Sequence, residues 1–189
     1  MKYFYHGSGN SGITELQARS KLHGTQEKVV YFTDNIPYAL FYLWDEKHVG
    51  YGCKHITGWL KNGTAYYEEQ FPNQLKAFYQ GASGYLYGVG QSPRVKAVEN
   101  RESLFYCPGN ILVEKVEPVA DVYRALMKQE AKGALVVLRY EEQTEQRRKE
   151  LTDLIAEFIL REQFFEQDTQ RREFFRTYFQ AAWKNAENL

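Results

Sequence analysis

The sequence predicts an α+β protein with a helical C-terminal end, and three observations support this class. Up to about residue 140, short runs of β-branched and aromatic residues alternate with glycine-containing connections. These connections include a tight hairpin signal as well as helical segments, which favours α+β over a repeating βαβ arrangement. Residues 141–189 contain no glycine or proline. We therefore predict a mixed domain over residues 1–140 and a helical appendage over residues 141–189.

The segments with strand character are short, and most are bounded by turn-forming residues. In chain order they are residues 3–5, 29–33, 59–61, 64–67, 85–89, 111–116 and 134–140. Asn62-Gly63 is the strongest hairpin signal in the chain and predicts that the segments on either side of it pair.

Helices are expected between these strands, at residues 13–22, from 34 or 35 to about 44, 71–79 and 119–129. Asp34 or Asn35 can cap the second helix, which has Pro37 in its first turn. Gly81 suits the position just after the third helix, where the backbone adopts a left-handed conformation.

The C-terminal part has the apolar spacing of amphipathic helices. A first apolar face repeats at i, i+3, i+4, i+7 and i+8, and it consists of Leu151, Leu154, Ile155, Phe158 and Ile159. A second, more aromatic face consists of Phe174, Phe175, Tyr178, Phe179 and Trp183. Residues 167–169 interrupt the run, so we predict a helical hairpin that packs on the domain or forms a homodimer and carries no catalytic residue.

Composition excludes several classes of function. The formal net charge is zero, which argues against a general nucleic-acid binder. Cys53 and Cys107 form no CxxC pattern, and His23, His48 and His55 match no metal-binding spacing. Residues 1–5 show no apolar signal-peptide region, so we expect no signal peptide, and the sequence contains no apolar run of the roughly 18–20 residues that a membrane span needs. We expect a cytoplasmic protein with reduced thiols and no metal.

Three short motifs suggest a function together. Tyr5-His6-Gly7-Ser8 ends the first predicted strand, Tyr31 lies in the strand that leads into a helix, and Tyr42 follows eleven residues later. In this combination, residues 3–140 resemble the ADP-ribosyltransferase family in its His-Tyr-Glu branch, which includes diphtheria-type toxins and poly(ADP-ribose) polymerases. The resemblance implies two small, packed, antiparallel-rich sheets with short helices.

The resemblance also implies a binding site for NAD, which would be the substrate. The backbone of Gly7 would bind the nicotinamide amide, His6 the adenosine ribose, and Ser8 would help to hold the dinucleotide. Tyr31 and Tyr42 would stack on either side of the nicotinamide ring. A carboxylate would stabilise the positive charge that grows on the ribose when the bond to nicotinamide breaks.

The residue that supplies this carboxylate has two possible assignments. Glu102 precedes the strand-like residues 103–106 and is the first choice. If the strand at 111–116 is instead the equivalent one, Asn110 stands at its start and the site has no charge there. Glu99 and Glu114 are poorer candidates.

Two departures from the family narrow the expected activity. The chain has no Glu-x-Glu pair of the arginine-specific members, and Ala39 stands where the polymerases have a serine between the two tyrosines. We expect an NAD-dependent mono-ADP-ribosyltransferase with an unknown protein, nucleic-acid or small-molecule acceptor, or an NAD glycohydrolase. The alternatives are an inactive module that binds NAD or ADP-ribose, an interaction protein of a mobile element or phage, and an RNA 2′-phosphotransferase-like enzyme.

Overall fold

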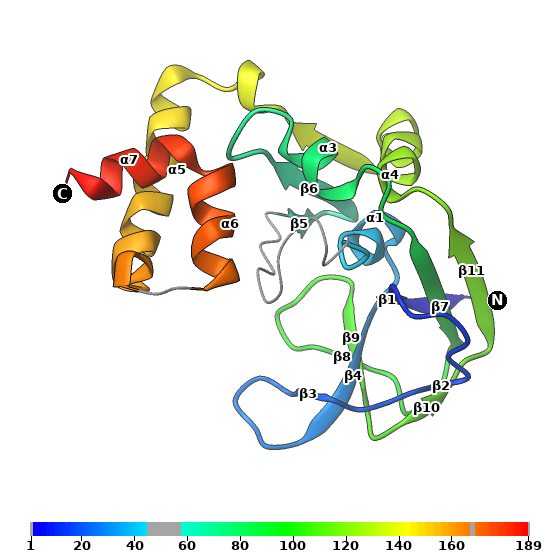
Figure 1. The fold of residues 1–189 in the computed structure, drawn as a ribbon. Helices are drawn as coiled ribbons and strands as arrows, with labels where there is room; N and C mark the ends of the chain where they lie inside the picture. Colours follow the sequence, from blue (N-terminus) through cyan, green and yellow to red (C-terminus); the bar gives the residue numbers. More distant parts are fainter. Residues whose placement is uncertain (1, 45–57, 167–168, 189) are drawn as a thin grey trace.

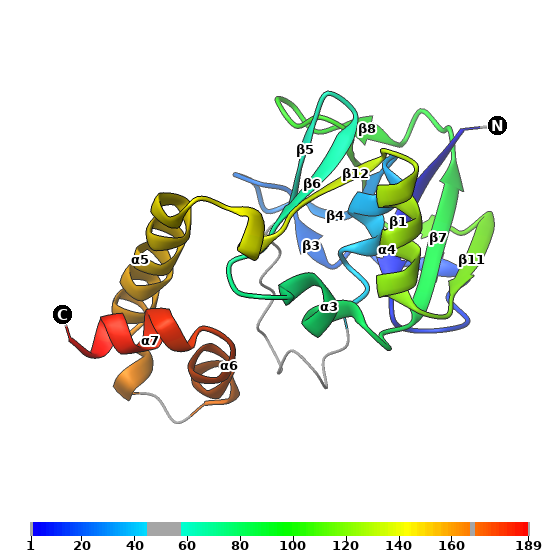
Figure 2. The same cartoon turned by 90° about the horizontal axis from the view of Figure 1, so that it is seen from above.

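The computed structural model describes residues 2–44, 58–166 and 169–188, and it has a sheet-rich part and a helical C-terminal part (Figure 1). The mixed α+β class predicted from the sequence is confirmed. Viewed from above, the three C-terminal helices lie to one side of the sheets (Figure 2). No helix in the described residues is long and apolar enough to cross a membrane.

The largest sheet is antiparallel and has the first strand near its middle. Its strand order is β11-β7-β1-β4-β9-β8, with β3 also paired to β4. The strands are β1 (Tyr3–Ser8), β3 (Ser20–Lys21), β4 (Lys28–Thr33), β7 (Gly84–Gly90), β8 (Lys96–Ala97), β9 (Leu104–Pro108) and β11 (Lys115–Val119). Segments far apart in the sequence therefore meet around β1 and β4.

A smaller sheet contains the predicted hairpin. Strands β5 (Gly58–Lys61) and β6 (Thr64–Glu68) are antiparallel, and β12 (Leu135–Leu138) adds to β6 in parallel. Asn62 and Gly63 have φ values of 52° and 77°, the left-handed conformation that a tight hairpin turn requires.

The helix expected at residues 13–22 is wrong. This segment forms β2 (Glu15–Leu16), which pairs with β10 (Ile111–Leu112), and then β3. Leu16 is 3% exposed and belongs to a hydrophobic cluster beneath the large sheet, so burial and strand pairing override the local helical preference. The strand expected at 111–116 is divided into β10, which pairs with β2, and β11, which pairs with β7.

The other expected helices of the sheet-rich part form, with adjusted ends. They are α1 (Ile36–Leu40), α3 (Gln74–Tyr79) and α4 (Val122–Ala131). Asn35 caps α1 by accepting a hydrogen bond from the Tyr38 N–H at 2.9 Å, and α1 ends earlier than expected. Gly81 follows α3 with a φ of 79°, as its predicted position requires.

The C-terminal part forms three α-helices and not a hairpin of two. They are α5 (Glu145–Arg161), α6 (Gln170–Tyr178) and α7 (Gln180–Glu187), with short 3-10 turns at Tyr140–Glu142 and Phe164–Glu166. The predicted break includes residues 167 and 168, which lie outside the described residues. A second break occurs at Phe179, whose ring lies 5.2 Å from that of Phe71 and 5.1 Å from that of Phe175.

Two hydrophobic clusters lie on opposite faces of the large sheet. Neighbouring residues of β7 show this, because Leu86 belongs to one cluster and Tyr87 to the other. The smaller cluster contains Phe4, Leu16, Val30, Phe32, Tyr87, Val89, Cys107 and Ile111. The larger one joins the sheets to the C-terminal helices, and Phe78 contacts Phe174 there at a ring distance of 5.7 Å.

Candidate functional site

His6 lies near the end of β1 and is bonded to the neighbouring strand. Its Nδ1 is 3.0 Å from the backbone oxygen of Tyr31. A carbonyl can only accept, so this contact requires the proton on Nδ1 and leaves Nε2 of the neutral ring as an acceptor. Burial lowers the pKa of His6, although the bond to Tyr31 opposes this shift. The neutral ring can therefore accept a hydrogen bond from a hydroxyl group through Nε2.

Gly7 lies where α1 passes close to β1. A Cβ at this position would lie 2.5 Å from the backbone oxygen of Ala39 and 3.3 Å from the side chain of Leu43. Only glycine fits beneath this part of the chain. The next residue, Ser8, accepts a hydrogen bond from the Asn10 N–H at 3.2 Å, which organises the turn after β1.

Tyr31 is held at its hydroxyl end. The phenol donates to the backbone oxygen of Lys21 at 3.2 Å and accepts from the His23 N–H at 3.3 Å. Both partners belong to the segment around β3 that leads back into β4. These two bonds fix the direction of the Tyr31 ring without any ligand.

Tyr42 follows α1 and keeps part of its ring at the surface. The side chain is 44% exposed, and its ring lies 5.8 Å from that of Tyr38 and 6.2 Å from that of Trp44. Burial of the phenol and the neighbouring Tyr38 raise the pKa of Tyr42. Among the described residues, no ring contact joins Tyr42 to Tyr31.

Glu102 lies in the connection before β9, and its carboxylate binds the β5–β6 turn. One oxygen accepts from the Asn62 N–H at 2.9 Å and the other from the Gly63 N–H. The backbone oxygen of Gly63 in turn accepts from Asn35 Nδ2 at 3.0 Å. The connection before β9, the hairpin turn and the start of α1 therefore share one set of hydrogen bonds.

Asp34 adds a second link between the end of β4 and this connection. It pairs with Lys2 at 2.8 Å and forms a hydrogen bond with Ser103, the residue after Glu102. Burial acts to raise the pKa of Asp34, but the bonds to Lys2 and Ser103 outweigh it and hold the pKa below its usual value.

Asn110, the alternative third residue, lies in different surroundings. Its side-chain oxygen accepts from the Ala18 N–H at 3.0 Å, and its Nδ2 donates to Gln17 at 2.8 Å and to Glu15 at 3.2 Å. These partners belong to the β2 segment. Asn110 therefore fastens this segment to β10, and it shares no partner with His6, Tyr31 or Glu102.

The sheet explains which of the predicted residues come together. Strands β1, β4 and β9 are neighbours, with Tyr5 opposite Thr33 and Thr33 opposite Leu104. His6 and Tyr31 are hydrogen-bonded directly. Glu102 binds the hairpin turn, and the turn binds Asn35, which follows Asp34 after the end of β4. Asn62 and Gly63, the partners of Glu102, and Asn35, which binds the same turn, were not among the predicted site residues.

A signal for this contact existed in the Asn-Gly pair. A tight turn with left-handed residues presents successive N–H groups, and such groups bind anions. The pair was interpreted only as a hairpin turn. No local pattern indicates that its anion comes from a residue about 40 positions later.

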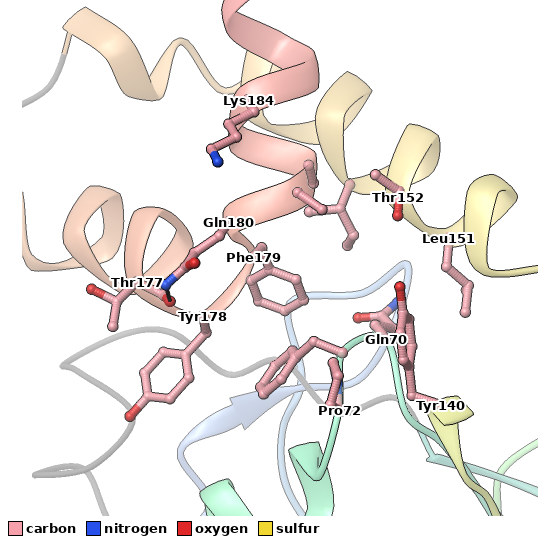
Figure 3. A pocket seen from close by; sticks show the side chains of 14 residues that line it. Gln70, Pro72, Tyr140, Leu151, Thr152, Thr177, Tyr178, Phe179, Gln180 and Lys184 are labelled. Carbon is pink, nitrogen blue, oxygen red and sulfur yellow. Dashed lines mark hydrogen bonds between the residues drawn. The ribbon is translucent and has the colours of Figure 1, made fainter. Parts of the chain in front are cut away.

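A cavity of about 560 Å³ lies away from these residues, between the sheet-rich part and the C-terminal helices. Figure 3 shows Pro72 and Tyr140 on one side of it and Gln180 and Lys184 on the other. None of the predicted site residues is among the side chains that line it.

The described residues contain no group of three or more His, Cys, Asp or Glu side chains that could hold a metal ion. Cys107 is buried and unpaired, whereas Cys53, His48 and His55 lie outside the described residues. Comparisons with protein-family models, with curated proteins and with solved structures found no match for this chain.

Proposed function

We propose that this chain cleaves the nicotinamide–ribose bond of NAD, as a mono-ADP-ribosyltransferase or, with water as the acceptor, as an NAD glycohydrolase. The observation that carries the proposal is the arrangement of three residues around adjacent strands, with His6 on β1, Tyr31 on β4 and Glu102 in the connection before β9. His6 binds the backbone of Tyr31, and Glu102 is tied to the start of α1 directly after β4.

Each group has chemistry that suits the reaction. The neutral His6 can accept a hydrogen bond from a ribose hydroxyl at Nε2. The ring of Tyr31 offers an aromatic face whose direction is fixed by two hydrogen bonds at the phenol. Bond cleavage places positive charge on the ribose, and the anionic Glu102 would stabilise it electrostatically.

A second candidate function is a module of the same kind that binds NAD or ADP-ribose without turnover. The specific observation in its favour is that both oxygens of Glu102 already accept backbone N–H groups. A carboxylate oxygen has two lone pairs, so each can still accept one further bond. The two functions therefore differ in turnover and not in the site that they use.

The deciding experiment measures free nicotinamide after incubation with NAD. We expect release by the unmutated protein and a decrease in kcat of about 10²–10³-fold in Glu102→Gln, the usual scale for one electrostatic stabiliser. NAD affinity should change little, because the charge on the ribose develops only near the transition state.

Asn110→Ala is the matched control, since it tests the alternative third residue in the same assay. Full activity in Glu102→Gln together with a large loss in Asn110→Ala would reverse the assignment. If the unmutated protein binds NAD but releases no nicotinamide, the binding module is the correct function. The absence of any affinity for NAD or nicotinamide would overturn both.

A further inference from the structure

We infer that the β5–β6 turn holds the carboxylate of Glu102 in one orientation, and that Asn35 is a positioning residue that locks this turn in place. The catalytic consequence of this arrangement rests on the proposed function. The binding of the Glu102 carboxylate by the turn, called the hold below, does not depend on any ligand or activity.

The carboxylate is bound at both oxygens by one rigid unit. The N–H groups of Asn62 and Gly63 are consecutive in the chain, and each binds a different oxygen of Glu102. Two donors fixed to the same turn define both the position of the carboxylate and the plane in which it lies. A single hydrogen bond would leave the carboxylate free to rotate.

Asn35 connects this turn to the strand that carries Tyr31. Its side-chain oxygen caps α1 by accepting from the Tyr38 N–H, and its Nδ2 donates to the backbone oxygen of Gly63. The two ends of one amide thus bind two different elements. The turn would lose its side-chain link to α1 without Asn35, although the strands β5 and β6 would still form it.

The backbone on the other side of the contact supports the same conclusion. Ser103, directly after Glu102, has a φ of 54°, a left-handed conformation that is unfavourable for a non-glycine residue. Ser103 also bonds to Asp34, which directly precedes Asn35. An unfavourable backbone conformation is maintained where the surrounding contacts determine it, and such positions cluster at functional sites.

Fixed geometry matters for the proposed reaction because an electrostatic stabiliser must face the charge when it develops. Misplacement of a catalytic group by about 1 Å can lower a rate by about 10²-fold. Loss of the bond between Asn35 and the turn should therefore decrease the rate of bond cleavage and leave the binding of ground-state NAD unchanged.

The test uses two variants that keep the helix cap and remove the donor to Gly63. Asn35→Ser and Asn35→Asp both supply a capping oxygen for α1, since Ser and Asp are as favourable as Asn at this position. An ionised Asp has no donor, and the shorter Ser carries its only donor on the same oxygen that would cap α1, whereas Asn35 uses separate atoms for the two bonds. The control is Thr144→Ala, which removes the side-chain cap of α5 far from the turn and should leave the site unchanged.

Two measurements are made on the full chain. The first is amide hydrogen exchange of Asn62 and Gly63, which should become about tenfold faster in both Asn35 variants and in Glu102→Gln, but not in Thr144→Ala. The second is nicotinamide release, for which we expect kcat to decrease about 10–100-fold in both Asn35 variants with KM unchanged. A double variant of Asn35→Ser and Glu102→Gln should lose little more than Glu102→Gln alone.

The outcomes separate this inference from the proposed function. Unchanged amide exchange in both Asn35 variants would overturn the role of Asn35, and unchanged exchange in Glu102→Gln would overturn the hold, whatever the activity. Faster exchange with full kcat would overturn the positioning role while the proposed function stands. If the unmutated protein releases no nicotinamide, the proposed function and the catalytic role fail together, and exchange that responds in the Asn35 variants and in Glu102→Gln still supports the hold.

Discussion

The sheet-rich part and the C-terminal helices are both rich in aromatic residues, but they use them differently. In the sheets, partners come from distant segments, as when β1 pairs with β4 on one side and β7 on the other. In the helices, rings close in sequence pack on each other, such as Phe164 on Phe175 at 4.9 Å. All of the predicted site residues belong to the first kind of structure. Distant pairing brings different chemical groups together, whereas local ring packing mainly supplies stability.

The joint between the two parts is also rich in aromatic residues. Phe71 and Phe78 meet Phe174, Tyr178 and Phe179 there, at ring distances of 5.2–5.8 Å. The 560 Å³ cavity lies beside this contact (Figure 3). An aromatic cluster with open space next to it is thus one of the contacts through which the helices pack on the sheets.

The largest expected effect tests whether local ring packing stabilises the helical part. Phe175 is 2% exposed and contacts several other rings. We expect Phe175→Ala to lower the free energy of unfolding by about 3–5 kcal/mol, measured by denaturant titration. Leu154→Ala on α5 is the control, because Leu154 is 57% exposed and should change stability by less than about 0.5 kcal/mol. Equal losses in both variants would contradict this account of the helices.

The next effect concerns a buried carboxylate that links the two parts. Glu69 is 2% exposed and accepts from the Leu75 N–H at 3.0 Å and the Tyr140 N–H at 3.2 Å. In Glu69→Gln the amide nitrogen would face one of these donors. We expect a loss of about 1.5–3 kcal/mol in the free energy of unfolding. The exposed Glu141 is the control, and if Glu141→Gln costs as much, Glu69 has no special role in the joint.

Sequence reasoning succeeded where structure is encoded locally. The β4 strand, the Asn62-Gly63 turn and the glycine after α3 all follow from the residues themselves. The prediction of a helix at residues 13–22 failed because Leu16 packs in a cluster of residues that are mostly distant from it in the sequence. The break at Phe179 could not be predicted, because it contains no glycine or proline and follows from the packing of one ring.

The candidate site divides in the same way. The resemblance named His6, Gly7 and Tyr31 as site residues, and it is the structure that shows their strands, β1 and β4, to be neighbours. The partners of Glu102 could not be predicted, because Asn62 and Gly63 stand 40 and 39 positions earlier and bind through their backbone, which carries no side-chain signal.

A smaller effect compares the same helix position in both parts. The residue after the C-cap is Gly81 following α3 and Gln163 following α5, with φ values of 79° and 55°. We expect Gly81→Ala to destabilise the protein by about 1 kcal/mol and Gln163→Gly to stabilise it by a similar amount. Thermal unfolding of the two variants should shift in opposite directions. Shifts in the same direction would show that packing and not backbone conformation governs these positions.

The smallest effect is a dependence of stability on pH near the pKa of histidine. It should arise from the sheet-rich part, because residues 141–189 contain no histidine. Burial lowers the pKa of His6 below the value of 6.5 that applies to the unfolded chain, so the unfolded state binds the proton more readily. Stability should therefore decrease as the pH falls below about 6.5. His6→Gln should reduce this slope in urea titrations, whereas the exposed His23→Gln should keep it.

The central place of β1 also affects how the protein is made. This strand is synthesised before its two neighbours, of which β7 spans Gly84–Gly90, and the small sheet is completed only by β12 at Leu135–Leu138. One edge of β1 therefore has no partner until residues 84–90 have been synthesised. Unpaired strand edges recruit other strands, so the nascent chain is prone to aggregation during this interval.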